Sequence, residues 1–88
     1  MKLIEKSFEV SAAGREEVLR RVCSEFGYCS LGDAYDRLLE NPPETIVEFV
    51  DAIIAGEGLN PETVTNGLKR RIRDLVIDAV DRHGGRIW

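Results

Sequence analysis

The segment from residue 46 to residue 54 constrains the fold of this chain more than any other. Its apolar side chains recur at helical spacing and cover more than half of the circumference of a helix. Pro43 precedes it and is tolerated in a first helical turn, whereas Gly56 follows it and ends the helix. The pattern therefore predicts a helix over about 43–55, central in the core or shared between core and interface. Its apolar positions are Ile46, Val47, Phe49, Val50, Ile53 and Ile54.

A second helix is predicted over 12–26. Ser11 is a suitable N-cap, because its hydroxyl can accept a hydrogen bond from a backbone N–H that the first turn leaves unpaired. Gly27 can adopt the left-handed conformation that often follows a helix. Apolar residues at spacings of three and four form one stripe, which consists of Val18, Leu19, Val22, Cys23 and Phe26.

Two further helices complete the prediction. One spans about 31–40, where Ser30 is the expected cap and the prolines after Asn41 end the helix. The other begins at Asn60 and continues to about residue 83, because Asn-Pro-Glu is a common helix start and two glycines follow His83. Gly67 is the weak point of this long helix.

The chain of 88 residues fits one domain, with residues 1–10 as an arm and residues 11–88 as a bundle. We therefore expect an all-α fold, a compact bundle of about four helices. The arm is predicted to be extended, although a short helix also suits it. A lone strand needs a partner, which could be residues 86–88 or a second copy of the chain.

Several classes of protein are disfavoured by the sequence. The first residues lack the apolar core of a signal peptide, and no apolar run is long enough to span a membrane, so we expect a cytoplasmic location. The chain has only Cys23, Cys29 and one histidine, which are too few for a structural zinc site. No metal or cofactor is therefore expected. Cys23 lies on the apolar stripe and is predicted to be a small buried side chain, and whether it pairs with Cys29 stays open.

The sequence predicts no enzyme. Nucleophilic catalysis needs a nucleophile beside a base, and the only histidine, His83, stands at the end of a predicted helix. The chain contains no phosphate-binding loop and no zinc-protease motif. A row of carboxylates on the last helix is better explained as surface ion pairs with nearby arginines. These carboxylates are Asp74, Asp78 and Asp81, and the arginines are Arg70 and Arg82.

Charge is unevenly distributed along the chain, whose net charge is −4. Residues 33–62 carry eight acids against one base, and such polarity steers association with a partner of opposite sign. The expected function is a non-enzymatic protein-binding domain that covers a basic partner surface. Inhibitors of the immunity or antitoxin type, and adaptors, share this size and charge. The predicted contact residues are Asp33, Tyr35, Asp36, Glu40, Glu44, Glu48 and Asp51.

An alternative function is DNA binding through residues 53–73. The stretch Gly58–Val64 with the basic residues after Leu68 resembles the turn and recognition helix of LuxR-type helix-turn-helix regulators, although Asn60 replaces the usual serine. The resemblance implies DNA contacts to phosphates or base edges from Thr65, Asn66, Lys69, Arg70 and Arg73.

A homodimer is a further expectation. Ile77 falls on the outer side of the last predicted helix, among charged side chains, and the aromatic residue Trp88 follows near the end of the chain. Such a pattern could form the seam between two copies.

Overall fold

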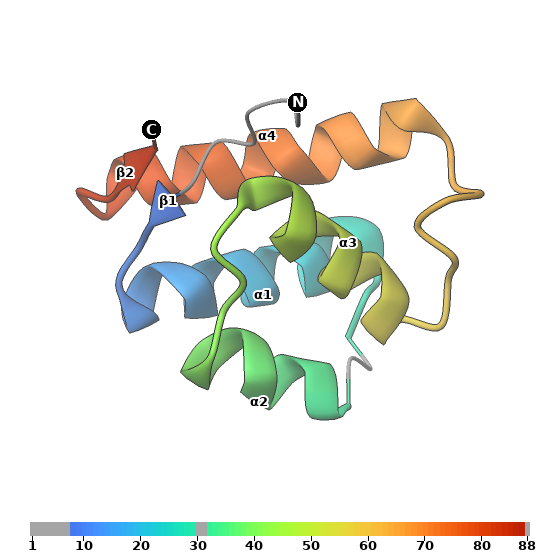
Figure 1. Ribbon diagram of the computed structural model, residues 1–88, viewed down its shortest axis with the longest axis horizontal. Helices are drawn as coiled ribbons and strands as arrows, with labels where there is room; N and C mark the ends of the chain where they lie inside the picture. The colour runs from blue at the N-terminus through green and yellow to red at the C-terminus, as the bar shows by residue number, and fades with distance from the viewer. Residues whose placement is uncertain (1–7, 30–31, 88) are drawn as a thin grey trace, which may run out of the picture.

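The computed structural model describes residues 8–29 and 32–87, and these form four helices and one two-stranded ladder (Figure 1). The helices are α1 (Ala12–Phe26), α2 (Asp33–Glu40), α3 (Ile46–Gly56) and α4 (Asn66–Arg82). The strands are β1 (Phe8–Glu9) and β2 (Arg86–Ile87). The expected all-α bundle of four helices is thereby confirmed.

The boundaries predicted for α1 are confirmed. The Ser11 side chain accepts a hydrogen bond from the Gly14 N–H at 3.2 Å, as expected of an N-cap. Gly27 adopts a positive φ of 75°, and its N–H bonds to the Cys23 carbonyl oxygen. The i,i+4 pair Glu16–Arg20 forms on the exposed side of the helix, and the pair Glu17–Arg21 forms where α1 faces α4.

The other three helices begin later than predicted. The start of α2 is at Asp33, and the proposed cap Ser30 and first residue Leu31 lie outside the described residues. Neither Pro43 nor Glu44 belongs to α3, because Thr45 caps that helix by accepting the Glu48 N–H at 3.2 Å.

The start of α4 was also predicted too early. Asn60 does form a turn, since its carbonyl oxygen accepts the N–H groups of Thr63 and Val64. That turn does not continue, and Thr65 caps a new helix by accepting the Leu68 N–H at 3.2 Å. Gly67 consequently lies in the first turn of α4 and marks no bend in its middle.

The N-terminal arm pairs with the C-terminal segment in the described region. Phe8 faces Ile87 and Glu9 faces Arg86 in an antiparallel ladder, which confirms one of the two partners expected for an extended arm. The Phe8 ring also meets the Phe49 ring edge-on at a centroid distance of 5.5 Å. The arm is thus attached both to β2 and to the core. Residues 1–7 and Trp88 lie outside the described residues.

The four helices pack in a closed ring. Both α1 and α3 pack against α2 and α4, so that α3 crosses the middle of the bundle while α2 and α4 lie at opposite edges (Figure 1). Five of the six predicted apolar positions of α3 are buried, and Val47 remains exposed. The buried residues of α3 are Ile46, Phe49, Val50, Ile53 and Ile54.

Arg15 ties the arm, α1 and α2 together. Its Nε and Nη2 atoms donate to the Leu39 carbonyl oxygen at 3.0 and 2.7 Å, and Nη1 donates to the Val10 carbonyl oxygen at 2.6 Å. Bonds from a charged donor are stronger than neutral ones, and Leu39 is in the last turn of α2, where carbonyls lack helical partners. Arg15 therefore donates hydrogen bonds to a carbonyl oxygen at the C-terminal end of α2.

Glycine is required where α1 passes the arm and the end of α4. A Cβ atom added to Gly14 would collide with Val10 Cγ2 and lie 3.2 Å from the His83 Cβ. Gly14 is buried, so that the contact cannot be relieved by movement into solvent.

We predict that Gly14→Ala lowers the free energy of unfolding by about 1–2 kcal/mol, because the clash exceeds the helix-propensity gain of alanine. The matched control is Gly67→Ala, whose new Cβ would have its nearest neighbour 4.0 Å away. The control should raise stability by about 0.5 kcal/mol. Urea denaturation followed by circular dichroism measures both values, and an equal response of the two variants would contradict the close approach at Gly14.

Candidate functional site

A groove between α3 and α4 combines exposed apolar surface with a group of cations. Val47 is 50% exposed at one side of it, and the cationic side chains come from α4. Its volume is about 280 Å³, slightly below the ~300–1,000 Å³ of sites that enclose small ligands. The groove is lined by Val47, Val50, Asp51, Asn66, Lys69, Arg70 and Arg73.

Four of the five residues predicted to contact DNA meet in this groove, namely Asn66, Lys69, Arg70 and Arg73. Thr65 has a different role, because its side chain caps α4. The arrangement differs from a helix-turn-helix in its connection. Residues 57–65 separate α3 from α4, whereas the two helices of that motif are joined by about 3–4 residues.

The acidic residues predicted to bind a partner come from α2, from α3 and from the connection between these helices. Asp33, Asp36 and Glu40 are exposed and share one face of α2, as their spacing of three and four residues requires. Tyr35 is 38% exposed but points to a different side of α2, since successive residues are about 100° apart on a helix. Tyr35 therefore does not lie at the centre of this acidic face.

The three remaining acids of that prediction have separate surroundings. Glu44 is exposed in the connection before α3. Glu48 accepts a hydrogen bond from the Thr45 hydroxyl at 2.9 Å, so its carboxylate takes part in the cap of α3. Asp51 lies in the groove, 3.8 Å from Lys69 Nζ. Charge reversal at Glu48 would accordingly disturb the fold as well as any interface.

A row of ion pairs joins α1 to α4 on the side of α4 away from the groove. Glu17 accepts a hydrogen bond from His83 at 3.1 Å and lies 3.3 Å from Arg82. Arg21 donates to Asp78 at 2.8 Å. The predicted pair Asp78–Arg82 is present at 3.5 Å, whereas Asp74 pairs with Arg73. These contacts explain His83 and Asp78 as parts of a helix–helix seam.

This seam shifts the ionisation of its carboxyl groups. The hydrogen bond from His83, together with a weaker effect of Arg82, lowers the pKa of Glu17. The hydrogen bond from Arg21 lowers the pKa of Asp78, and the same bond raises the pKa of Arg21. A carboxyl group with a depressed pKa in the folded state stabilises the fold when it is ionised.

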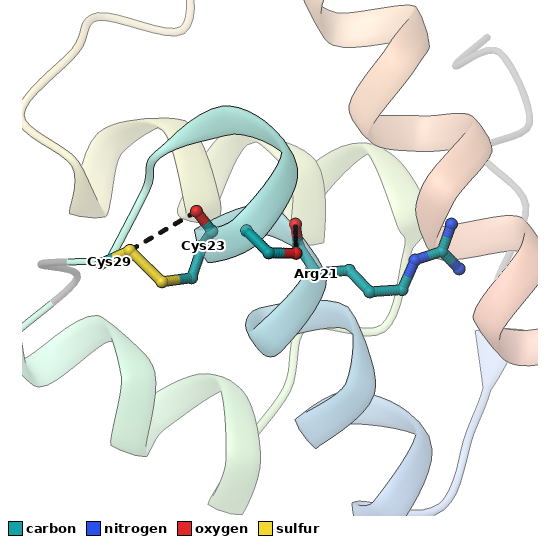
Figure 2. The surroundings of a disulfide bond; sticks show 4 residues. Arg21, Cys23 and Cys29 are labelled. Carbon is teal, nitrogen blue, oxygen red and sulfur yellow. Dashed lines mark hydrogen bonds between the residues drawn. A yellow bond between two sulfur atoms is a disulfide. The ribbon is translucent and has the colours of Figure 1, made fainter.

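The prediction that Cys23 is a buried thiol was wrong. Cys23 is half-buried and forms a disulfide with the exposed Cys29, six residues later (Figure 2). Gly27 turns the chain back at the end of α1, and this turn brings the two sulfurs together. The bond fixes the start of the connection from α1 to α2, while Arg21 reaches from α1 in another direction, toward α4 (Figure 2).

Neither a metal site nor a membrane-spanning helix is found among the described residues. Within that part of the chain, no three carboxylate, histidine or cysteine side chains are grouped so that they could hold a metal ion. None of the described helices combines the length and the apolar character needed to cross a membrane.

Comparisons with known proteins add no relative. No protein family, curated protein or solved structure matches the chain.

We predict that Asp78→Asn destabilises the protein at neutral pH and that this difference shrinks as the pH falls to about 3. Wild-type Asp78 contributes stability above its unfolded pKa of about 3.9 and loses it on protonation in the folded state. Glu62→Gln is the control, because Glu62 is exposed and forms no ion pair with the described residues. Urea titrations between the two pH values test this, and a pH-independent difference would contradict the seam.

We predict that Cys23→Ala/Cys29→Ala lowers the free energy of unfolding by about 2 kcal/mol, because the bond limits the conformations of the unfolded chain. A reducing agent should lower wild-type stability to the same level and leave the variant unchanged. Chemical denaturation with and without dithiothreitol makes the comparison. Equal stability of oxidised wild type and variant would show that the disulfide does not support the fold.

Proposed function

We propose that the chain is a non-catalytic protein-binding domain whose principal contact surface is the groove between α3 and α4. The observation that carries this proposal is the exposed Val47 beside Lys69, Arg70 and Arg73. Protein interfaces combine apolar contacts with a polar rim and are enriched in arginine. The groove has this composition, whereas the exposed Tyr35 lies to one side of the acidic face of α2.

A protein partner suits the groove better than DNA does. Asp51 places a carboxylate among the lining residues, where it would repel a phosphate group. An exposed valine gains from meeting apolar side chains, which a nucleic-acid backbone does not offer. DNA binding through Asn66, Lys69, Arg70 and Arg73 remains the second proposal, because these residues do lie together.

The acidic face of α2 is proposed as a second contact surface, for a partner with a basic patch. Asp33, Asp36 and Glu40 form no ion pair with other described residues, so their field is directed into solvent. An inhibitor or adaptor of the immunity type would use such a face to cover a basic cleft. This surface would guide association electrostatically more than it would add affinity.

A cytoplasmic location stays part of the proposal. Reducing compartments keep most protein thiols unpaired, so there the bond between Cys23 and Cys29 would form only on transient oxidation. Non-reducing electrophoresis after rapid alkylation of intact cells would find the pair reduced at rest. A permanently oxidised pair would assign the protein to an oxidising compartment.

We predict that affinity-tagged protein captures a partner that Arg70→Glu/Arg73→Glu loses and that Arg20→Glu/Arg37→Glu retains. Both variants change the net charge equally, and Arg20 and Arg37 are exposed on α1 and α2, away from the groove. Lys69 is left unchanged so that its ion pair with Asp51 survives. Mass spectrometry of the eluate identifies the partner.

The same experiment separates the proposals. Asp36→Lys/Glu40→Lys should leave the groove partner bound, and its control is Glu16→Lys/Glu62→Lys, two exposed acids elsewhere. Loss of the partner with the α2 variant alone would move the contact surface to α2. Nucleic acid in the eluate that disappears with Arg70→Glu/Arg73→Glu, without any protein partner, would replace the protein-binding proposal by DNA binding.

A further inference from the structure

The outward side of α4 carries a charge pattern that reverses along the helix. Asn66, Arg70, Arg73, Ile77 and Asp81 follow one another at spacings of three or four residues, so they lie on one face. The first half of this face is basic, because Arg70 and Arg73 line the groove with α3. The second half is acidic, because Asp81 is exposed there and lines another hollow beside Ile77, whereas Asp74 stands beside Arg73 and pairs with it at 3.7 Å. Ile77, which is 36% exposed, lies between the two halves.

A partner of uniform charge can satisfy only half of such a face. A second α4 that runs in the opposite direction satisfies both halves, since its acidic end meets the basic end of the first. With the two Ile77 side chains at a twofold axis, Arg73 and Asp81 lie four residues on either side of that axis. Arg73 of each copy then faces Asp81 of the other, as a self-complementary twofold interface requires.

The apolar surface fits the same arrangement. Ile77 stands one turn beyond Arg73 on α4, and Val47 shares the groove with Arg73. These are two of the four large apolar side chains that are exposed in the described region. On the opposite side of α4, Asp78 and Arg82 are occupied by ion pairs with α1, so the outer face is free of that seam. In Figure 1, α4 runs along one edge of the bundle, with α1 and α3 on its inner side.

We propose that the chain forms an isologous homodimer through antiparallel packing of the outer faces of α4, with Ile77 near the twofold axis and Val47 at its border. The inference rests on the proposed function, because it names a second copy of the chain as a partner of the groove surface. With Ile77 at the axis, the two copies of α4 overlap over residues 72–82, about 16 Å of helix, so the contact is modest in area and the dimer is in exchange with monomer.

The test uses two charge-reversal variants of the purified full chain. Arg70→Glu/Arg73→Glu makes the α4 face wholly acidic, and Asp74→Lys/Asp81→Lys makes it wholly basic. Each variant alone should be monomeric, because like charges oppose each other in the antiparallel pair. An equimolar mixture should form a heterodimer, because the reversed charge at position 73 of one variant then faces the opposite, reversed charge at position 81 of the other. Circular dichroism confirms that both variants are folded.

Sedimentation equilibrium provides the readout. The wild type should approach twice its chain mass of 9.9 kDa at about 0.1 M salt and dissociate toward monomer at about 1 M, where the screening length falls from about 10 to 3 Å. Ile77→Lys should abolish the dimer, whereas Leu59→Lys, an exposed apolar residue in the connection to α4, should retain it.

The inference is overturned if the wild type is monomeric at both salt concentrations, or if a dimer persists in both single variants. It is also overturned if the mixed variants remain monomeric. A monomeric wild type that binds a DNA duplex, and loses it with Arg70→Glu/Arg73→Glu, would assign the groove to nucleic acid. A monomeric wild type whose foreign protein partner is lost with that variant would reject the dimer but leave the proposed function standing.

Discussion

Burial of α3 is the constraint on which the rest of this structure depends. The apolar residues of α3 from Ile46 to Ile54 cover an arc too wide for any one neighbouring helix to bury alone. The bundle solves this by placing α2 and α4 on either side of α3 and closing the ring with α1. Phe8 of the arm completes the cover by packing on Phe49. In a chain this short, leaving that arc uncovered would remove much of the apolar burial that stabilises the fold.

The sequence predicted the existence and order of the helices better than their starts. Periodic apolar residues identify a helix over its whole length, which is why the four helices and the limits of α1 could be predicted. A start depends on which of several nearby capping residues makes its hydrogen bond. Thr45 caps α3, although Pro43 suggested an earlier start of that helix. Thr65 caps α4, although Asn60 suggested an earlier start there. Both choices are visible only once the chain is folded.

The roles of several site residues depend on contacts between segments that are far apart in the sequence. The sequence indicated that Lys69, Arg70 and Arg73 would lie together, because they are neighbours on one helix. It could not indicate that Asp51 of another helix lies against Lys69, or that Glu48 caps α3. Nothing in the sequence indicated that Arg15 donates to Leu39 and Val10, since the acceptors are backbone carbonyl oxygens. The turn at Gly27 could have suggested that Cys23 and Cys29 approach each other.

The two sides of α4 have different physical requirements, and this separates folding from the proposed binding. Its inner side buries Ile72, Leu75 and Val76 and is joined to α1 by hydrogen-bonded ion pairs, so changes there alter stability first. Its outer side holds exposed charges and Ile77, whose contribution to the isolated fold is small. On a surface that adds little to the stability of the fold, residues can change to suit a binding partner without unfolding the protein. Arg70, Arg73, Ile77 and Asp81 can therefore be varied as a group while the bundle itself stays intact, as a test of the proposed contact surface requires.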